Sequence, residues 1–466
     1  MNHFLEADTQ NIQHLLNTVA DEALNFLQGV SDRPVAVLPN KQDMFTLPED
    51  GIGAVKTLER FKTKYIRGLS GSSGPRYLGF VTGGSTPAAI VGDWLVSVFD
   101  QNVASSGDSC APDIELETIN LLRQLFRLSD AHSGSFVTGA TMSNFVGLAL
   151  ARQWIAQQHG VDVADSGLYN LPPINVLSAT PHSSIFKALS MLGMGRSNVQ
   201  IVPSLRDREA VDIDQLKQRL HDLKGQPCIV VANAGTVNTV DFDDLKAIAD
   251  LKQEFSFWMH TDAAFGGFAA CSPNYSHLVE EMDASDSITI DAHKWLNVPY
   301  DSAMQFTRHT ALQVKVFQNS AAYIGLPTDQ PDFVHLTPEN SRRLRALPAW
   351  FTLMAYGANG YQEIIERNCE LAQALGRKIE NSTGFKLLSP VRLNVVCFTL
   401  AESSEVTQSR VGKFLAFVRD AGKVFLTPTV YQGTPGIRAA FCNWRTEYHD
   451  LEIAWCSMTE TLARLS

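Results

Sequence analysis

Lys294 is the residue of this sequence best suited to covalent chemistry. It stands in SITIDAHKWLNVPYDSA, directly after His293 and shortly after an apolar run. Lysine is almost never fully buried unless it is paired. A lysine amine that is taken out of water becomes a nucleophile able to form a Schiff base with a carbonyl compound. Most lysines lie on a solvated surface and have no catalytic role. The case for a catalytic Lys294 therefore depends on the segments around it.

Three further segments carry groups that can act together with this lysine. FVTGATMSNFVGLALAR, residues 136–152, predicts a turn of small residues and then a helix that starts near Ser143. The free N–H groups of such a helix N-terminus attract phosphate. His182 stands in SATPHSSIFKAL, and Asp262 follows an apolar run in FWMHTDAAFGG. Each segment alone has a plain structural explanation, as a turn, a helix cap or a core residue.

Short apolar runs indicate the elements that position these residues. Strands are predicted at residues 174–178, 228–232, 257–260 and 287–290, and helical stretches separate several of them. Strands that alternate with helices predict an α/β fold with a mostly parallel sheet covered on both faces. Ligands bind such sheets at the carboxyl ends of the strands. The histidine, aspartate and lysine segments all lie next to these predicted strands.

Taken together, the four segments supply what pyridoxal 5'-phosphate (PLP) needs: a phosphate cradle, an imidazole face, an acid for a ring nitrogen and a Schiff-base lysine. The chain resembles the fold-type I PLP enzymes, and among them the group II amino-acid decarboxylases, which include the aromatic-amino-acid, glutamate and diaminobutyrate decarboxylases. DAHKWLNVPYDSA and HTDAAFGG carry the resemblance most specifically. CAPDIELETINLL, TGATMSN, SRRLRALPAWFTLMAYG and GIRAAFCNWRT extend it from about residue 75 to near residue 455.

This resemblance implies a role for each matching residue. Lys294 would hold PLP as a Schiff base, Asp262 would keep the pyridine nitrogen protonated, and His182 would stack on the ring near the substrate carboxylate. The remaining expected cofactor contacts are Ala140, Thr141, Thr236, Ala264 and His293. Arg438 is a candidate substrate residue, with a structural ion pair as the alternative.

Several positions depart from the pattern of the aromatic-amino-acid decarboxylases. Asp291 replaces an asparagine near the phosphate, so its carboxylate is expected to point elsewhere or to pair with a base. Phe333, in the loop DFVHLTPENSRR, stands where those enzymes have a catalytic tyrosine, and Phe80 falls near a substrate-pocket tyrosine. Both changes remove a hydroxyl group. Tyr323 lies upstream in the same loop and is the expected substitute as a catalytic residue.

The function that we predict is decarboxylation of an L-amino acid to an amine and CO2. One alternative keeps PLP but yields an aldehyde by oxidative deamination, or a transamination product. Another is a PLP-binding protein without catalysis, against which the intact Asp262 and Lys294 weigh. The loss of a loop hydroxyl at Phe333 bears on the first alternative, because a proton must reach Cα before an amine can form.

The resemblance also implies the architecture: an N-terminal helical arm (1–70), a large PLP-binding domain with a mixed, mainly parallel sheet (71–345) and a small C-terminal α+β domain (346–466). A homodimer with its active site at the subunit interface is expected, and the partner molecule is a small amino-acid substrate. Specificity depends on a few pocket side chains, so the sequence does not name that amino acid.

Composition narrows the class of protein further. The 466 residues are 45% hydrophobic and 19% charged, with a net charge of −11, which disfavours a nucleic-acid partner. No apolar stretch reaches the roughly 20 residues that span a bilayer. The seven cysteines include no CxxC pair, so neither a disulfide framework nor a bound metal is expected. The N-terminus lacks the features of a signal peptide, which favours a cytoplasmic protein.

Overall fold

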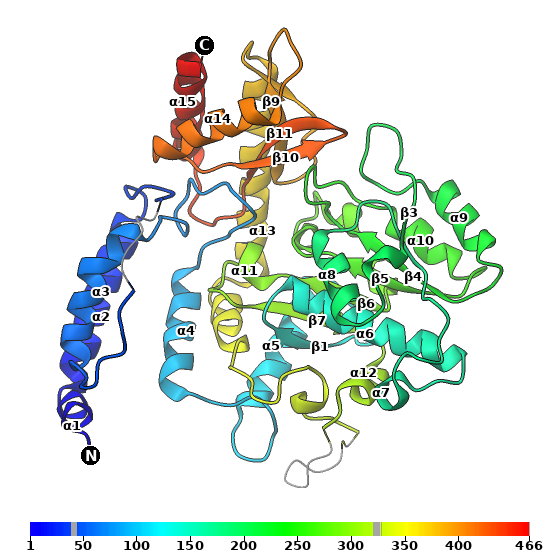
Figure 1. Cartoon of the computed structure of the whole chain (residues 1–466), viewed down its shortest axis with the longest axis horizontal. Coiled ribbons are helices and arrows are strands. Elements are labelled where there is room, and N and C mark those ends of the chain that lie inside the picture. The colour runs from blue at the N-terminus through cyan, green and yellow to red at the C-terminus, as the bar shows by residue number, and fades with distance from the viewer. Residues whose placement is uncertain (39–43, 320–326, 328, 466) are drawn as a thin grey trace.

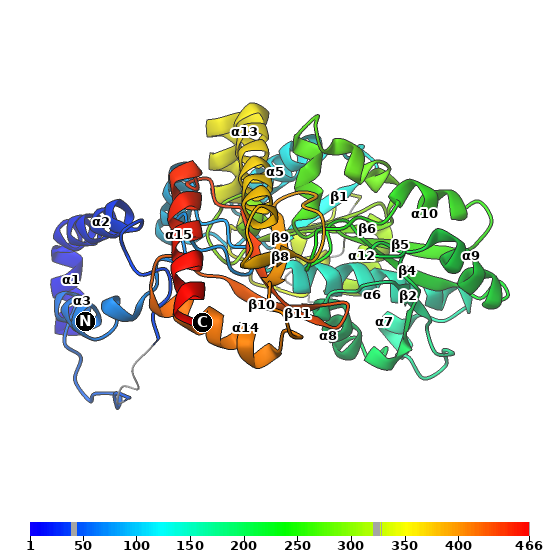
Figure 2. The same cartoon turned by 90° about the horizontal axis from the view of Figure 1, so that it is seen from above.

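The computed structural model describes residues 1–38, 44–319, 327 and 329–465. Three regions are visible: a group of N-terminal helices at one side, a large sheet covered by helices, and a smaller sheet at the C-terminal end (Figure 1). The view from above shows the N-terminal helices at the far edge from the large sheet (Figure 2). Within the described residues, every helix is too short or too polar to cross a membrane.

The N-terminal region contains helices, in line with the helical arm that the resemblance implies. It comprises α1 (His3–Gln10), α2 (Ile12–Gly29) and α3 (Ala54–Lys64), and an ion pair between Lys62 and Glu22 links α3 to α2. None of these three helices contains a buried residue. The apolar side of the arm is therefore exposed in a single chain.

The large sheet has seven strands in the order β1-β7-β6-β5-β4-β2-β3. The strands are β1 (Ser133–Val137), β2 (Val176–Ser178), β3 (Val199–Ile201), β4 (Cys228–Asn233), β5 (Phe257–Asp262), β6 (Ser287–Ile290) and β7 (Ala303–Thr307). Strand β7 is antiparallel to both of its neighbours, and the pairs from β6 to β3 are parallel. The expectation of a mixed, mainly parallel sheet is confirmed.

Both faces of this sheet are buried, which explains why its central strands read as continuous apolar runs. In β4, Ile229 and Val231 pack into the core that includes α6 (Ala140–Gln158), α8 (Ser183–Met191) and α12 (Thr310–Phe317). Cys228 and Val230 point to the opposite core, which α5 (Ala111–Leu125), α9 (Ile213–Asp222) and α10 (Leu245–Leu251) help to build. Helix α6 begins at Ala140, earlier than the predicted start near Ser143, because Met142 and Ser143 already donate to the carbonyl of Gly139.

The smaller sheet is antiparallel, in the order β10-β11-β9-β8. Its strands are β8 (Phe385–Leu387), β9 (Val395–Leu400), β10 (Thr427–Tyr431) and β11 (Thr434–Ala440), with α14 (Gln408–Asp420) and α15 (Tyr448–Leu465) beside them. Helix α13 (Ala346–Glu380) connects the two sheets and follows α4 (Pro87–Phe99) along part of its length (Figure 1). It is broken at Gly357, whose φ of 61° suits glycine.

Candidate active site

A cavity of about 410 Å³ lies at the carboxyl ends of β2, β4, β5 and β6. Residues from the segment before α4 and from β11 of the small sheet complete its wall. Nine of the residues singled out in the sequence line it: Phe80, Ala140, His182, Thr236, Asp262, Ala264, His293, Lys294 and Arg438. Thr141 follows Ala140 in the first turn of α6 but is not part of the lining.

Lys294 lies in α11 (Ala292–Trp295), the short helix after β6. Its Nζ is 3.4 Å from Oδ2 of Asp291 and 5.5 Å from the ring centre of Phe265. The other carboxylate oxygen of Asp291 is 3.2 Å from Nδ1 of His293. The expectation that Asp291 pairs with a base is thus confirmed. The amine is partly buried, with one anionic neighbour and an aromatic face, and its end remains open to the cavity.

The backbone around Lys294 is held by a close crossing of another segment. A side chain at Gly83 would place its Cβ 1.7 Å from the carbonyl oxygen of Lys294. Only glycine permits this approach. The segment that carries Phe80 and Val81 is thereby fixed over the lysine, and both of these residues line the cavity.

Asp262 ends β5, with 7% of its surface exposed. Nδ2 of Asn144 donates to its Oδ2 at 3.0 Å, and the backbone N–H of Ala264 donates to its Oδ1 at 3.2 Å. Two donors from fixed elements hold the plane of the carboxylate. Asp262 also lines the cavity, where a protonated ring nitrogen would find an anionic acceptor.

His182 is the N-cap residue of α8. Its Nδ1 accepts from the backbone N–H of Ser184 at 3.3 Å and lies 2.7 Å from the Ser184 hydroxyl. Burial lowers the pKa of His182, and the Asp262 charge acts in the opposite direction. His182 is therefore a helix cap through Nδ1 and also lines the cavity, so the cap leaves the functional role open.

The N-terminus of α6 provides an anion site of the expected kind. Gly139 is its N-cap residue and contributes no side-chain hydrogen bond, so the first N–H groups of the helix remain for an anion. Ser143 donates to Thr289 Oγ1 at 2.8 Å and lies 3.0 Å from the Met304 carbonyl, which anchors this end of α6 to the sheet. The ring of His293 comes close to Gly139, 3.5 Å from where a Cβ would stand. The cradle fits a phosphate beside His293.

Thr236 lines the cavity, but its hydroxyl proton is already engaged. The hydroxyl donates to Oε2 of Glu209 at 2.5 Å and accepts from the backbone N–H of Asp241. Thr239 donates to the same carboxylate oxygen through its backbone N–H and its hydroxyl. Thr236 is therefore held as a rigid part of the wall, and its hydroxyl proton is not directed at His182.

Arg438 reaches the cavity from β11 and is 8% exposed. Nη2 donates to the carbonyl of Phe80 at 3.1 Å, while Nε is buried without a hydrogen-bond partner. Desolvation lowers its pKa. Among the described residues no carboxylate pairs with this guanidinium, so the predicted alternative of a structural ion pair is not what the structure shows. Phe80, whose φ is 58°, is held in a strained conformation next to it.

Phe333 lies outside this cavity within its own chain. It is 2% exposed, and the guanidinium of Arg342 sits 4.6 Å from its ring centre. Together with Asp332 it lines a separate cavity of about 460 Å³. Arg342 in turn forms a buried ion pair with Glu115, at 2.7 Å. Tyr323, the predicted hydroxyl substitute, lies outside the described residues.

The sequence reasoning assigned no role to several residues that shape the site. Tyr300 lines the cavity, and its ring lies tilted by 36° against that of His293 with ring centres 4.3 Å apart. Its hydroxyl is 3.2 Å from that of Thr82. Burial raises its pKa. Tyr300 stands in DAHKWLNVPYDSA, so the sequence places it close to Lys294. The sequence does not show that its side chain points into the cavity. Asn144, behind Asp262, carried no signal beyond its place after the phosphate turn.

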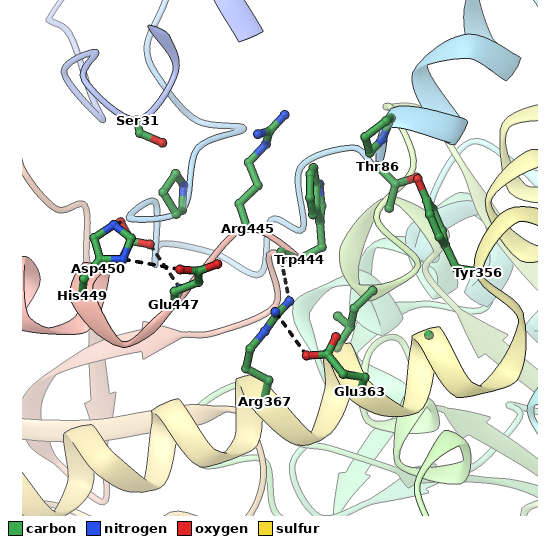
Figure 3. Close-up of a pocket in the computed structure, with 14 residues that line it drawn as sticks. Ser31, Thr86, Tyr356, Glu363, Arg367, Trp444, Arg445, Glu447, His449 and Asp450 are labelled. Carbon is green, nitrogen blue, oxygen red and sulfur yellow. Dashed lines mark hydrogen bonds and ion pairs between the residues drawn. The ribbon is translucent and has the colours of Figure 1, made fainter. Parts of the chain in front are cut away.

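Another cavity, of about 480 Å³, lies between α13 and the segment before α15 (Figure 3). Its charged groups face one another: Arg367 pairs with Glu363 at 3.2 Å, and His449 lies 3.6 Å from Glu447. Arg445 covers the ring of Trp444. None of the residues singled out in the sequence lines it. We therefore assign the chemistry to the cavity around Lys294.

A lysine, an aspartate and a histidine around one cavity, at the carboxyl ends of parallel strands and beside a helix N-terminus, define the class of fold-type I PLP enzymes. The chain matches the model of the pyridoxal-dependent decarboxylase conserved domain over residues 47–401 and belongs to this family. It is thus a PLP-dependent carboxy-lyase by family. Its cofactor is pyridoxal 5'-phosphate.

Known proteins resemble the chain over nearly its full length. It is 25% identical to the aromatic-L-amino-acid decarboxylase of Bacillus atrophaeus, with 97% of this chain and 95% of that protein covered. It is 24% identical to the 3,4-dihydroxyphenylacetaldehyde synthase of Aedes aegypti, with 96% and 89% covered. The crystal structure of Oryza sativa TDC with PLP and tryptamine shares the fold, with a TM-score of 0.89, 22% identity and 98% of both chains covered.

Proposed function

We propose that the protein decarboxylates an L-amino acid to the corresponding amine and CO2, with Lys294 as the cofactor-bearing residue. The observation that carries this proposal is the placement of Lys294, Asp262 and His182 around one cavity beside the open N-terminus of α6. When bound, PLP supplies an aldehyde that reacts with an amine and a protonated ring that accepts electrons from the bond to be broken.

The residues of the chain divide the remaining tasks. Asp262, fixed by Asn144 and Ala264, offers a carboxylate to the ring nitrogen. His293 and the first turn of α6 would hold the phosphate. Lys294 needs an unprotonated amine, and Asp291, 3.4 Å away, can accept hydrogen bonds from that amine while it exchanges its proton. Preorganised charges of this kind supply much of the rate enhancement of enzymes.

Arg438 is the proposed substrate-carboxylate residue. Its guanidinium is buried, it lines the same cavity as Lys294, and its Nε has no hydrogen-bond partner. Buried charges are normally paired, and a substrate carboxylate would provide the missing partner. His182 completes this side of the cavity and is the proposed group that assists at the carboxylate or at Cα.

The fate of Cα decides between two products. After CO2 leaves, Cα must receive a proton for an amine to form, and reaction with O2 leads instead to an aldehyde. His182 and the hydroxyl of Tyr300 both line the cavity and can hold such a proton, which favours the amine. The aldehyde is the second candidate, since Phe333 lacks a hydroxyl and the Aedes aegypti relative is named 3,4-dihydroxyphenylacetaldehyde synthase.

Product analysis tests the proposal directly. The purified holoenzyme is incubated under air with each proteinogenic L-amino acid and with diaminobutyrate, and CO2, amine, aldehyde and peroxide are measured. We expect amine and CO2 in equal amounts for one substrate class. Aldehyde and peroxide in stoichiometric amounts, falling in Phe333→Tyr, would establish the second candidate instead. Reduction with borohydride and peptide mapping should find the cofactor on Lys294, and a label on any other lysine would contradict its role.

We also propose a homodimer in which a second copy covers the N-terminal region. Large apolar residues are exposed on both α2 and α4, among them Leu16, Val19, Trp94 and Val98. Burial of such patches drives association. Sedimentation of the wild type should give about twice the mass of one chain, whereas Trp94→Glu should shift the population to monomers. A monomeric wild type at micromolar concentration would refute the dimer.

A further inference from the structure

A series of hydrogen-bonded side chains, called the hydrogen-bond chain below, runs from β5 in the large sheet to the cavity. Its members are Trp258, His260, Ser287, Asn144, Ser184 and His182, with Asp262 as a branch. All except His182 are at least nine-tenths buried. Because water does not reach them, their hydrogen bonds must satisfy one another.

The deepest part of the chain starts from a fixed donor. The indole N–H of Trp258 can only donate, so the Ser287 hydroxyl accepts it at 2.9 Å. That hydroxyl then has its own proton to give, and Nδ1 of His260 lies 2.7 Å away. Burial lowers the pKa of His260 to about 4, so its ring is neutral at pH 7. With Nδ1 as acceptor, the ring carries its proton on Nε2.

Asn144 transmits this direction to the cavity. Nε2–H of His260 donates to Oδ1 of Asn144 at 2.9 Å. The Asn144 amide nitrogen therefore faces the other way, where it donates to Oδ2 of Asp262 and to the Ser184 hydroxyl, both at 3.0 Å. The reversed amide would set an oxygen against the Asp262 carboxylate and an N–H against a donating Nε2. Both ends of the amide thus agree on its orientation.

The last link fixes His182. Since the Ser184 hydroxyl accepts from Asn144, it is free to donate to Nδ1 of His182 at 2.7 Å, and the backbone N–H of Ser184 donates to the same nitrogen. A neutral His182 must then carry its proton on Nε2. The ring presents an N–H group, rather than a lone pair, on the side away from the helix cap.

The close packing of α6 against the sheet makes this hydrogen-bond chain possible. Gly147 lies one turn after Asn144, and a Cβ there would stand 2.7 Å from the His260 ring and 3.0 Å from the Ser287 hydroxyl. Only a residue without a side chain lets α6 approach closely enough for Asn144 to bridge His260 and Asp262.

We propose that Asn144 is a positioning residue that joins Asp262 and His182 in one hydrogen-bond chain of fixed direction, so that His182 presents Nε2–H to the cavity. The inference rests on the proposed role of His182 and adds what sets its tautomer together with the backbone N–H of the helix cap. It explains how the acid at the ring nitrogen and the donor at the substrate carboxylate are aligned by a single amide.

The test reads the tautomer separately from turnover. The full-length chain is labelled with ¹⁵N at histidine side chains, and the His182 signals are assigned by their loss in His182→Gln. We expect a non-protonated Nδ1 and a protonated Nε2 at pH 8, with and without added PLP. A protonated Nδ1, or two tautomers in comparable amounts, would overturn the proposal. This outcome differs from failure of the proposed function, which would show as no amino-acid turnover with the tautomer unchanged.

Two variants separate the branches of the chain. Asn144→Ala removes the donor to Asp262, so PLP affinity should fall about 10- to 100-fold, the usual effect of losing a buried hydrogen bond to a charged group. Ser184→Ala keeps the Asn144–Asp262 contact, so PLP affinity should stay within about threefold while the His182 Nδ1 signal shifts. Asn381→Ala, an exposed asparagine bonded to a backbone carbonyl, is the matched control. Wild-type PLP affinity in Asn144→Ala, or an unshifted Nδ1 signal in Ser184→Ala, would contradict the proposed hydrogen-bond chain. The second measurement remains decisive if Asn144→Ala does not fold.

Discussion

Replacement of His260 should change how the stability of the protein depends on pH. Burial lowers the pKa of this histidine from 6.5 to about 4, and its two ring nitrogens are engaged by Ser287 and Asn144. Above pH 6.5 the ring is neutral in both the folded and the unfolded chain. As the pH falls, the unfolded chain binds a proton that the folded chain takes up only near pH 4, so stability is lost in this window.

The size of the effect follows from the two pKa values. At pH 4.5 the linkage relation gives a loss of about 2.5 kcal/mol relative to pH 7.5. For a chain of this length the unfolding entropy is roughly 1 kcal/mol per degree, so the melting temperature should fall by about 2 to 3 °C from this residue alone. His260→Gln keeps an N–H donor for Asn144 but cannot titrate, and it should lack this part of the pH dependence.

Calorimetry of both proteins at pH 7.5 and pH 4.5 makes the comparison. Asp243, whose pKa burial raises to about 6, titrates in the same range with the opposite sign, so only the difference between wild type and variant isolates His260. His221→Gln, on the exposed side of α9, is the surface control. If the difference in melting temperature between wild type and His260→Gln is the same at the two pH values, the buried His260 ring is not held neutral within the hydrogen-bond chain.

Three further outcomes are expected. Asp262→Ala removes the carboxylate proposed to face the ring nitrogen. The loss of transition-state stabilisation should be several kcal/mol, seen as a lower turnover rate, and wild-type turnover would exclude this role. Glu115→Gln leaves Arg342 charged and unpaired in the core, which should cost about 3 to 5 kcal/mol, and an unchanged melting temperature would contradict the buried ion pair. Arg438→Met keeps the side-chain volume and breaks no ion pair within the described part of the chain. It should raise KM about tenfold or more with little change in melting temperature, and the reverse pattern would mark Arg438 as structural.

The strands next to the chemical residues could be predicted from the sequence because they are buried on both faces. The predicted strand at 287–290 coincides with β6, and those at 228–232 and 257–260 fall one and two residues short of β4 and β5. Strand β1 was not predicted, because Ser133, Gly134 and Ser135 do not form an apolar run. These small residues suit a strand packed tightly between its neighbours: a Cβ at Gly134 would stand 2.8 Å from the Phe306 ring of β7 and 3.0 Å from Ile119 of α5.

The candidate site was predictable where one short segment carries both the position and the chemistry, as for Lys294 and Asp262. Asn144 could not be found in this way. Its partners His260 and Asp262 lie 116 and 118 residues away, and only the packing of α6 on the sheet brings them together. The position of Phe333 could not be predicted from the sequence either. Phe333 contacts Arg342, and Arg342 is held there by its buried ion pair with Glu115.

The hydrogen bond from Arg438 to the carbonyl of Phe80 joins residues 358 positions apart in the chain. The lysine, the aspartate and the phosphate cradle belong to the large sheet, whereas Arg438 arrives with β11 of the small one. The residues proposed to hold the cofactor and the residue proposed to bind the substrate carboxylate therefore come from two different sheets. If the proposed roles hold, a chain whose small sheet has come undocked would keep the residues that hold PLP but lose the carboxylate subsite. The yellow colour of bound PLP would then report on the large sheet, and turnover on both sheets together.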